Sequence, residues 1–181
     1  MAERVKSMVG AAAAWWREPL AYAALAALLI AGALVLEHGF GYLPCELCHW
    51  QRYPYYALLV VGLPYAGLRL AGRRTWIAER AMLALAGLAF LASGAIGAYH
   101  AGVEWHWWAG PGRCTGLGTL PDDPEALMAM LGKVKVIPCD EPALTILGLS
   151  LAAWNAMIGI AVGIAAVAAA LPERKGGARD G

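Results

Sequence analysis

Charged residues are scarce in this sequence of 181 residues. Only 15% are charged and 60% are hydrophobic, whereas soluble domains carry about 25% charged and roughly 45–50% apolar residues. The formal net charge of +1 lacks the basic excess that is typical of nucleic-acid-binding proteins. The sequence also has no Ser-His-Asp order, phosphate-binding loop or carboxylate cage, so hydrolysis, nucleotide chemistry and calcium binding have no supporting residues. These absences favour a membrane protein that makes no contact with nucleic acid.

Four apolar segments are long enough to cross a bilayer, which needs about 20 mostly apolar residues per helix. They are rich in Ala, Leu and Gly and show no alternation, so each is expected to satisfy its backbone hydrogen bonds as a helix. The sequence therefore predicts an all-α membrane protein with a single four-helix domain over residues 20–171. The predicted helices cover about residues 20–36, 54–71, 80–99 and 143–171, and residues 1–19 and 172–181 form the terminal segments.

The basic residues predict how these helices are oriented. Ten of the fourteen Lys and Arg residues lie before the first span, around the second connection or after the fourth span. With four spans these three regions share one side, which the positive-inside rule assigns to the cytoplasm. The other two loops, about residues 37–53 and 100–142, then face outward into an oxidising compartment.

All four cysteines lie in these two outward loops. Cys45 and Cys48 are two residues apart, close to the second span, and such a pair closes a small disulfide ring and often contains a thiol of lowered pKa. Cys114 and Cys139 lie in the long second loop, with Cys114 in a run of turn-forming residues that is expected to be exposed. Two cysteine pairs on one side of a membrane indicate electron transfer. A zinc site completed by histidines, or a purely structural disulfide, is the alternative.

Two charged or ionisable residues accompany the cysteines. Arg52 lies one helical turn after Cys48, where it can anchor the helix at the interface, stabilise a thiolate or bind a carbonyl oxygen of an acceptor. His100, near the end of the third span, either points into the headgroups or exchanges protons with an acceptor, oriented by Glu104. Asn155 in the fourth span is expected to pair across helices, and the glycines of the third and fourth spans to allow close helix contact.

The run from Pro44 to Arg52, PCELCHWQR, resembles the Cys-x-x-Cys-x-x-x-Arg region of the DsbB family of bacterial inner-membrane disulfide bond formation proteins. The resemblance extends over nearly the whole chain, through the four spans, the short first loop and the long second loop. It implies a thiol:quinone oxidoreductase whose redox loops face the periplasm and whose termini are cytoplasmic. A short membrane-parallel helix is expected in the second loop, at about residues 124–131.

The resemblance also implies a role for each cysteine. A periplasmic DsbA-like thioredoxin-fold protein would attack a Cys114–Cys139 disulfide and form a mixed disulfide with Cys114. Cys139 would then attack Cys45 and release Cys48 as a thiolate that donates electrons to quinone, either ubiquinone or menaquinone. Arg52 and His100 would be the quinone-binding residues, and no metal is expected.

Two rival interpretations remain open from the sequence. A vitamin-K-epoxide-reductase-like quinone enzyme has a similar bundle, but in that family the membrane-proximal cysteine pair follows the loop cysteines, whereas here it precedes them. The other rival is a non-enzymatic membrane protein in which the cysteines bind metal or form permanent disulfides.

Overall fold

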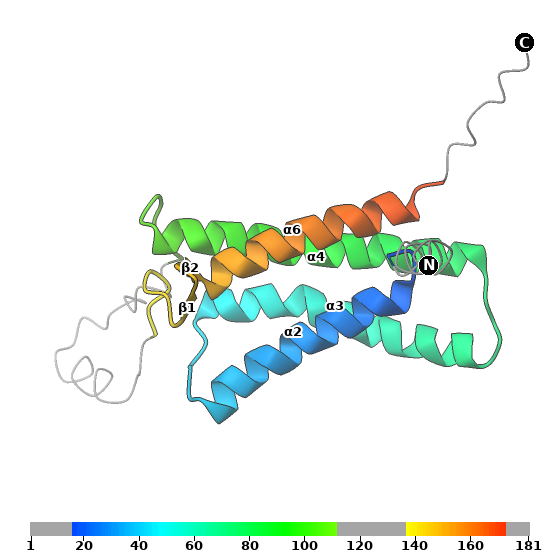
Figure 1. The fold of residues 1–181 in the computed structure, drawn as a ribbon, viewed down its shortest axis with the longest axis horizontal. Helices are drawn as coiled ribbons and strands as arrows, with labels where there is room; N and C mark the ends of the chain where they lie inside the picture. The colour runs from blue at the N-terminus through cyan, green and yellow to red at the C-terminus, as the bar shows by residue number, and fades with distance from the viewer. Residues whose placement is uncertain (1–15, 112–136, 173–181) are drawn as a thin grey trace, which may run out of the picture.

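The described part of the chain is a bundle of long helices. The computed structural model describes residues 16–111 and 137–172, in which four helices run roughly along the long axis of the molecule (Figure 1). These helices are α2 (Pro19–Gly39), α3 (Glu46–Leu70), α4 (Trp76–Glu104) and α6 (Leu151–Ala170). The predicted all-α membrane class is confirmed for these residues, apart from one short hairpin.

Three of the described helices, α2, α4 and α6, are long and apolar enough to cross a membrane. Helix α3 has 25 residues and is therefore about 37 Å long at 1.5 Å per residue. Its first two turns carry the polar residues Glu46, Gln51 and Arg52, which lower its mean hydropathy. The length of α3 thus suits a span, whereas its composition marks its first turns as a place for polar chemistry.

Side-chain caps determine where three of the helices begin. The Thr75 hydroxyl accepts a hydrogen bond from the Ala78 N–H at 3.3 Å, and the Ser150 hydroxyl accepts one from the Ala153 N–H at 3.1 Å. Such bonds satisfy N–H groups that have no partner within the helix. Cys45 takes the same position at the start of α3, where its sulfur accepts from the Cys48 N–H at 3.3 Å. The redox motif is therefore also the start signal of a helix.

This cap corrects the predicted start of the second helix. The sequence predicted a helix from about residue 54, but α3 begins at Glu46 and includes Cys48 and Arg52. The prediction followed the apolar residues and missed the cap, which extends the helix into the polar motif. Helix α4 likewise exceeds its predicted range of 80–99 at both ends, because Thr75 caps it and its last turn continues to Glu104.

A β-hairpin replaces the predicted beginning of the fourth helix. Strands β1 (Thr145–Ile146) and β2 (Leu149–Ser150) pair antiparallel, with Thr145 opposite Ser150 and Ile146 opposite Leu149. The turn residues Leu147 and Gly148 both have positive φ, 54° and 81°, as a two-residue hairpin of type I′ requires. Helix α6 therefore begins at Leu151 rather than at about residue 143.

Close packing of α4 against α6 forms one side of the bundle, as predicted from the glycines. A Cβ atom added at Gly94 would lie 2.8 Å from the Ile160 backbone nitrogen, and one added at Gly159 would lie 2.8 Å from the Gly94 Cα. Only hydrogen fits at these positions, so the two backbones are in direct contact. On the other side of α4, the Phe90 ring packs edge-on against Tyr55 of α3, with ring centroids 5.0 Å apart.

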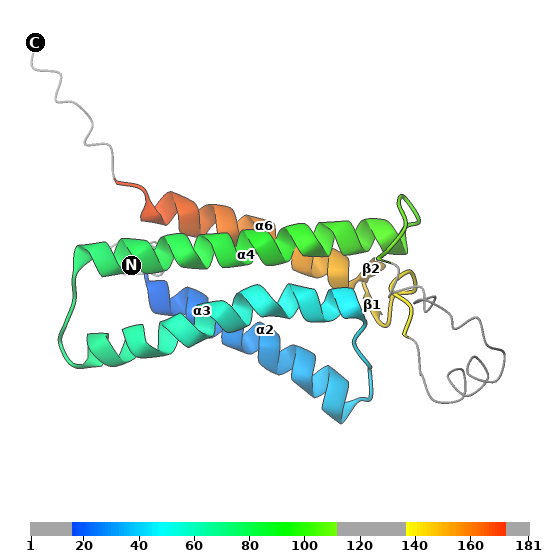
Figure 2. The same cartoon turned by 180° about the vertical axis from the view of Figure 1, so that it is seen from behind.

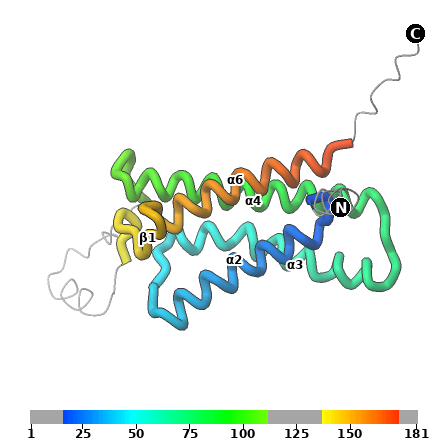
Figure 3. Tube along the Cα trace, in the orientation of Figure 1, coloured from blue at the N-terminus to red at the C-terminus, as the bar shows by residue number. Residues whose placement is uncertain are grey.

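The two ends of the bundle differ. One end holds the connection from α2 to α3, the last turns of α4, the hairpin and the start of α6, and the views from both sides agree on this (Figures 1 and 2). The opposite end holds the start of α2, the connection from α3 to α4 and the end of α6 (Figure 3). Cys45 thus lies at the end that carries the hairpin, which we call the cysteine end. Cys114 and the short helix predicted at 124–131 lie outside the described residues.

Candidate functional site

Cys45 and Cys48 form the centre of the candidate site, at the first turn of α3. Both are free cysteines, and their sulfur atoms lie 3.0 Å apart. Cys45 is buried at the helix cap, and Cys48 is partly exposed in the first turn. Because the cap and the first turn bring the two sulfurs together, the local fold alone makes the motif ready to close a disulfide.

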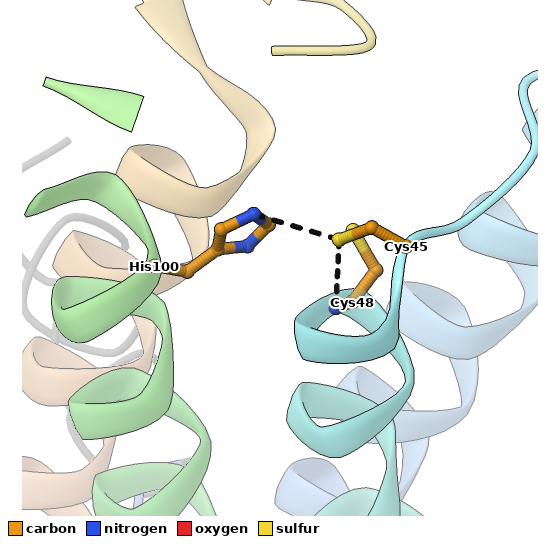
Figure 4. A group of neighbouring side chains, drawn as sticks. All are labelled: Cys45, Cys48 and His100. Carbon is orange, nitrogen blue, oxygen red and sulfur yellow. Dashed lines mark hydrogen bonds between the residues drawn. The ribbon is translucent and has the colours of Figure 1, made fainter. Parts of the chain in front are cut away.

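His100 faces this pair from α4 (Figure 4). Its Nε2 atom lies 3.5 Å from the Cys45 sulfur and 3.8 Å from Glu104 Oε1. The His100 side chain is only 3% exposed, so it points into the bundle and not into the headgroup region. The sequence predicted His100 as a site residue and Glu104 as its neighbour, and the structure brings both to the motif.

The surroundings of Cys45 strongly favour its thiolate. The hydrogen bond with Cys48 is the largest cause and, despite the opposing effect of burial, the pKa of Cys45 is lowered to about 4. Hydrogen bonds with His100 and the Cys48 N–H act in the same direction, as expected for a thiol at a helix N-terminus. Since two thiolates at this distance would repel each other, the remaining proton stays with Cys48.

Cys139 joins the same buried cluster from the second loop. The cluster contains Cys45, Leu47, Val103 and Cys139, with Cys48 packed against it. Cys139 is fully buried and is held in a disulfide. The structure therefore brings three of the four predicted cysteines into one neighbourhood, and the fourth, Cys114, lies outside the described residues.

A cavity of about 460 Å³ opens beside Cys48. Its wall consists mostly of apolar side chains, including Leu28, Leu29 and Ile30 of α2. Cys48 lines this cavity, whereas Cys45 and His100 do not. The two sulfurs thus have different neighbours, because Cys48 faces the cavity and Cys45 faces His100 and Cys139. The side chains of the wall that carry polar groups are Tyr42, Cys48, Gln51, Arg52, Tyr55, Trp154 and Asn155.

Arg52 reaches this cavity wall in an ion pair that the sequence analysis missed. Its guanidinium donates to Glu37 Oε2 at 2.6 Å, and the two side chains are only 12% and 20% exposed. Glu37 lies near the end of α2, where it neutralises a charge that would otherwise be costly at the membrane boundary. An acidic residue directly after the first apolar segment was the available signal, because the end of α2 meets the start of α3 across a short loop.

A chain of hydrogen bonds links the site to the interior of the bundle. Gln51 bonds to His100 and to Asn155, and Asn155 bonds to Tyr55 and Ser93. The predicted pairing of Asn155 across helices is therefore confirmed. Gln51, Tyr55 and Ser93 were missed, because an amide or hydroxyl within a helix carries no signal of its own until its partner on another helix is known.

Within the described residues, one group has the composition of a metal site. The ligand atoms of Cys45, Cys48 and His100 all lie within 4.8 Å of one another. Two thiolates and an imidazole are ligands that zinc accepts. His38 is not part of this group, because it is exposed and bonds the Leu34 carbonyl oxygen at 3.2 Å.

Fold and site together define a class of protein: a helical membrane protein with a cysteine pair between an apolar cavity and a third, disulfide-bonded cysteine. Residues 16–169 match the family described as disulfide bond formation protein DsbB, and the chain belongs to this family. This membership decides against the vitamin-K-epoxide-reductase-like alternative and implies oxidoreductase activity in disulfide formation.

Two relatives are similar to this chain over most of its length. Disulfide bond formation protein B from Herminiimonas arsenicoxydans is 30% identical over 135 residues, which cover 70% of this chain and 77% of the relative. An uncharacterized protein from Rickettsia prowazekii strain Madrid E is 26% identical over 135 residues, which cover 74% of each chain. No solved structure matches the chain significantly.

Proposed function

We propose that the protein is a bacterial inner-membrane thiol:quinone oxidoreductase that reoxidises a periplasmic DsbA-like protein of the thioredoxin fold. The observation that carries the proposal is that the two adjacent sulfurs have different surroundings. Cys48 lines an apolar cavity, while Cys45, 3.0 Å away, belongs to the buried cluster of Cys139. Electrons that enter at Cys139 therefore have a short path through Cys45 and Cys48 to an apolar acceptor.

The cavity residues fit a quinone. The wall is mostly apolar, as the isoprenoid-bearing ring of ubiquinone or menaquinone requires, and Cys48 and Arg52 are both part of it. Arg52 supplies hydrogen-bond donors for a carbonyl oxygen, held in place by Glu37. When bound, a quinone supplies the acceptor for two electrons and two protons. We assign no other cofactor.

The cysteine steps follow from thiol-disulfide exchange. One thiol of the reduced partner attacks the Cys114–Cys139 disulfide and forms a mixed disulfide with Cys114, which the second partner thiol resolves as the partner leaves oxidised. The Cys139 thiolate attacks the sulfur of Cys45 in the Cys45–Cys48 disulfide, so a Cys45–Cys139 bond forms and Cys48 leaves as a thiolate. Cys114 then attacks Cys139, which restores the outer disulfide and leaves Cys45 and Cys48 reduced.

Oxidation of Cys45 and Cys48 completes the cycle. Their disulfide would re-form if a quinone held beside Cys48 and Arg52 took up two electrons and two protons from the pair. The net reaction converts the two partner thiols to a disulfide and the quinone to a quinol. His100, beside Cys45, is placed to hold or transfer one of the two protons.

The orientation supports the same proposal. If α3 is the fourth span, the cysteine end lies opposite the end of the bundle that carries, among the described residues, Arg17, Arg69, Arg73, Arg74 and Arg80. The positive-inside rule then assigns the cysteine end to the periplasm. This is the compartment in which disulfides persist and in which a soluble thiol oxidase is found.

A quinone-reduction assay with purified protein tests the function. We expect reduced DsbA-type partner to drive quinol formation, with one partner disulfide formed for each quinol. Cys48→Ser should abolish quinol formation, whereas Cys45 and the outer cysteines remain available for exchange with the partner. Absence of turnover with both ubiquinone and menaquinone analogues would refute the proposal, and quinol formation by Cys48→Ser would refute the role of Cys48.

A further inference from the structure

The amide group of Asn155 has only one orientation that satisfies its neighbours. Its Nδ2 atom lies 3.1 Å from the Ser93 backbone oxygen, which can only accept. Its Oδ1 atom accepts from the Tyr55 hydroxyl at 3.0 Å. The Ser93 hydroxyl donates to the Gln51 backbone oxygen at 2.7 Å and is left to accept from Asn155 at 3.0 Å. All three contacts of the Asn155 amide agree on which side of it donates.

This orientation determines that of Gln51. Asn155 Nδ2 donates to Gln51 Oε1 at 2.9 Å, and Gln51 Nε2 lies 3.3 Å from the Leu47 backbone oxygen. A backbone oxygen accepts only, so the Nε2 end of the amide must face Leu47. The same Nε2 atom lies 2.8 Å from His100 Nδ1. Gln51 is therefore a donor toward His100.

His100 has one arrangement that fits this donor. If Gln51 donates, Nδ1 must accept, and the proton of the neutral ring must lie on Nε2. Nε2 faces the Cys45 sulfur at 3.5 Å and Glu104 Oε1 at 3.8 Å, and both atoms are acceptors when ionised. The donor on one side of the ring requires this tautomer, and the acceptors on the other side agree with it.

We propose that Gln51 is a positioning residue that holds His100 as the neutral Nε2–H tautomer, so that His100 donates a hydrogen bond to the Cys45 thiolate. Gln51, Ser93 and His100 are all buried, with 7%, 0% and 3% of their surface exposed, so water does not offer the amide an alternative partner. A second proton on Nδ1 would face the Gln51 amide hydrogens. The Gln51 amide therefore opposes the imidazolium that the Cys45 thiolate and Glu104 would otherwise favour.

The same tautomer argues against metal binding at the dithiol. A ligand to zinc must present a lone pair, and Nε2 is the His100 atom nearest to Cys45. With its proton on Nε2, His100 offers the sulfurs an N–H group and no lone pair. A metal would have to move the proton to Nδ1 against the Gln51 amide. Gln51 thus protects the Cys45–Cys48 pair from a thiophilic cation, although the three side chains have the composition of a zinc site.

The proposal rests on the proposed function only for the redox role of Cys45, and its tests need no turnover. The full chain, labelled with ¹⁵N-histidine and fully reduced, is studied by NMR in detergent micelles. The His100 signal is identified among the four histidines by its loss in His100→Gln. We expect a protonated Nε2 and an unprotonated Nδ1 near neutral pH. A protonated Nδ1 in the wild-type protein, in either the other tautomer or an imidazolium, would overturn the proposal.

Substitution of Gln51 gives the second test. In Gln51→Glu the carboxylate can only accept, so we expect the His100 proton to move to Nδ1 or a second proton to bind there. Asn155→Asp loses the group that donates to Gln51 Oε1. We expect it to change the His100 signal in the same way, but to a smaller extent. If His100 keeps the Nε2–H tautomer in a folded Gln51→Glu variant, Gln51 does not determine it.

Zinc titration provides a further test, because replacing a residue with a merely structural role would not strengthen zinc binding. We expect the reduced Gln51→Glu protein to bind Zn²⁺ about tenfold or more tightly than the wild type, in line with the effect of groups that orient a ligating histidine. His100→Gln in the Gln51→Glu background should remove the gain. Equal or weaker zinc binding by Gln51→Glu would contradict the proposed protection of the dithiol.

Discussion

Cys45 illustrates how a single residue combines a structural and a chemical role. Its sulfur caps α3 and lies within hydrogen-bonding distance of Cys48 and His100. A capping group that accepts a hydrogen bond from an N–H stabilises the helix more when it carries a negative charge, because the helix N-terminus is the positive end of the helix dipole. The position that starts the helix is therefore also the position at which a thiolate is most stable.

This coupling predicts the titration of Cys45. In a reduced Cys114→Ser/Cys139→Ser variant, we expect the ultraviolet absorbance of the Cys45 thiolate to persist until the pH falls to about 4. Because folding lowers the pKa, the thiolate contributes stability that is complete above the ordinary thiol pKa and is lost as the pH falls through the folded value. His100→Gln should move the titration upward. Titration of Cys45 near the ordinary thiol pKa would contradict this assignment, and Cys45→Ser provides the baseline.

The Glu37–Arg52 ion pair predicts a measurable coupling between α2 and α3. Both side chains are largely buried, so the removal of one leaves the other charge without a partner. We expect Glu37→Gln and Arg52→Gln each to lower the free energy of unfolding, and the double variant to lose less than the sum. A double-mutant cycle by thermal unfolding in detergent should give a coupling energy of about 1–3 kcal/mol. Additive effects would show that the pair contributes nothing to stability.

At the scale of the elements, close contact between α4 and α6 forms one half of the bundle. The contact depends on glycines, since a side chain at Gly94 or Gly159 would collide with the backbone of the opposite helix. His100 lies on α4 and Asn155 on α6, so this contact also determines how far apart the two side chains are. Gln51 of α3 forms hydrogen bonds with both of them. The packing of small residues far from the cysteines thus positions the polar chain at the site.

A matched pair of glycine substitutions tests this contact. Gly94→Ala should lower the free energy of unfolding by about 1–3 kcal/mol, because its Cβ would lie 2.8 Å from a backbone nitrogen of α6. Gly32→Ala in α2, where a Cβ meets nothing within 4 Å, should be neutral or stabilising by roughly 0.5–1 kcal/mol. Thermal unfolding in the same detergent measures both. Equal free energies of unfolding for the two variants would mean that the α4–α6 contact accommodates the added methyl group with no loss of stability.

At the scale of the whole molecule, the bundle separates two kinds of surface. The cysteine end carries the dithiol, the cavity mouth beside Arg52 and the exposed tryptophans Trp105, Trp107 and Trp108. Tryptophan is typical of the membrane-water boundary. The opposite end carries the connection between α3 and α4, with exposed Arg73 and Arg74. This polarity matches an orientation in which the two ends face different compartments.

Site-directed labelling tests the orientation. Phe40 and Arg73 are both exposed and lie in connections at opposite ends of the bundle. In a variant without native cysteines, we expect a membrane-impermeant maleimide to label Phe40→Cys in spheroplasts, and Arg73→Cys only after the membrane is permeabilised. Labelling of both positions from outside would mean that α3 does not cross the membrane, and the reverse pattern would invert the topology.

The sequence alone determined the membrane class, the approximate positions of the helices, the redox motif and the resemblance to the family. These features depend on local composition and spacing, which act within one segment of the chain. Cys45, Cys48, Arg52, His100 and Asn155 were predicted as site or pairing residues because their types are unusual at the edge of, or within, apolar segments. The predicted helix boundaries were wrong at α3, α4 and α6, because the Cys45 and Thr75 caps and the turn at Leu147 and Gly148 outweighed the apolar pattern.

Only the tertiary structure decided which groups meet across helices. That Cys48 faces the cavity while Cys45 faces His100, that Glu37 pairs with Arg52, and that Gln51 links His100 to Asn155 all depend on the packing of several helices. Contacts between residues up to about a hundred positions apart leave no trace in the spacing of either residue. They arise because buried polar groups must find partners where the helices place them, and burial makes each unmet partner costly.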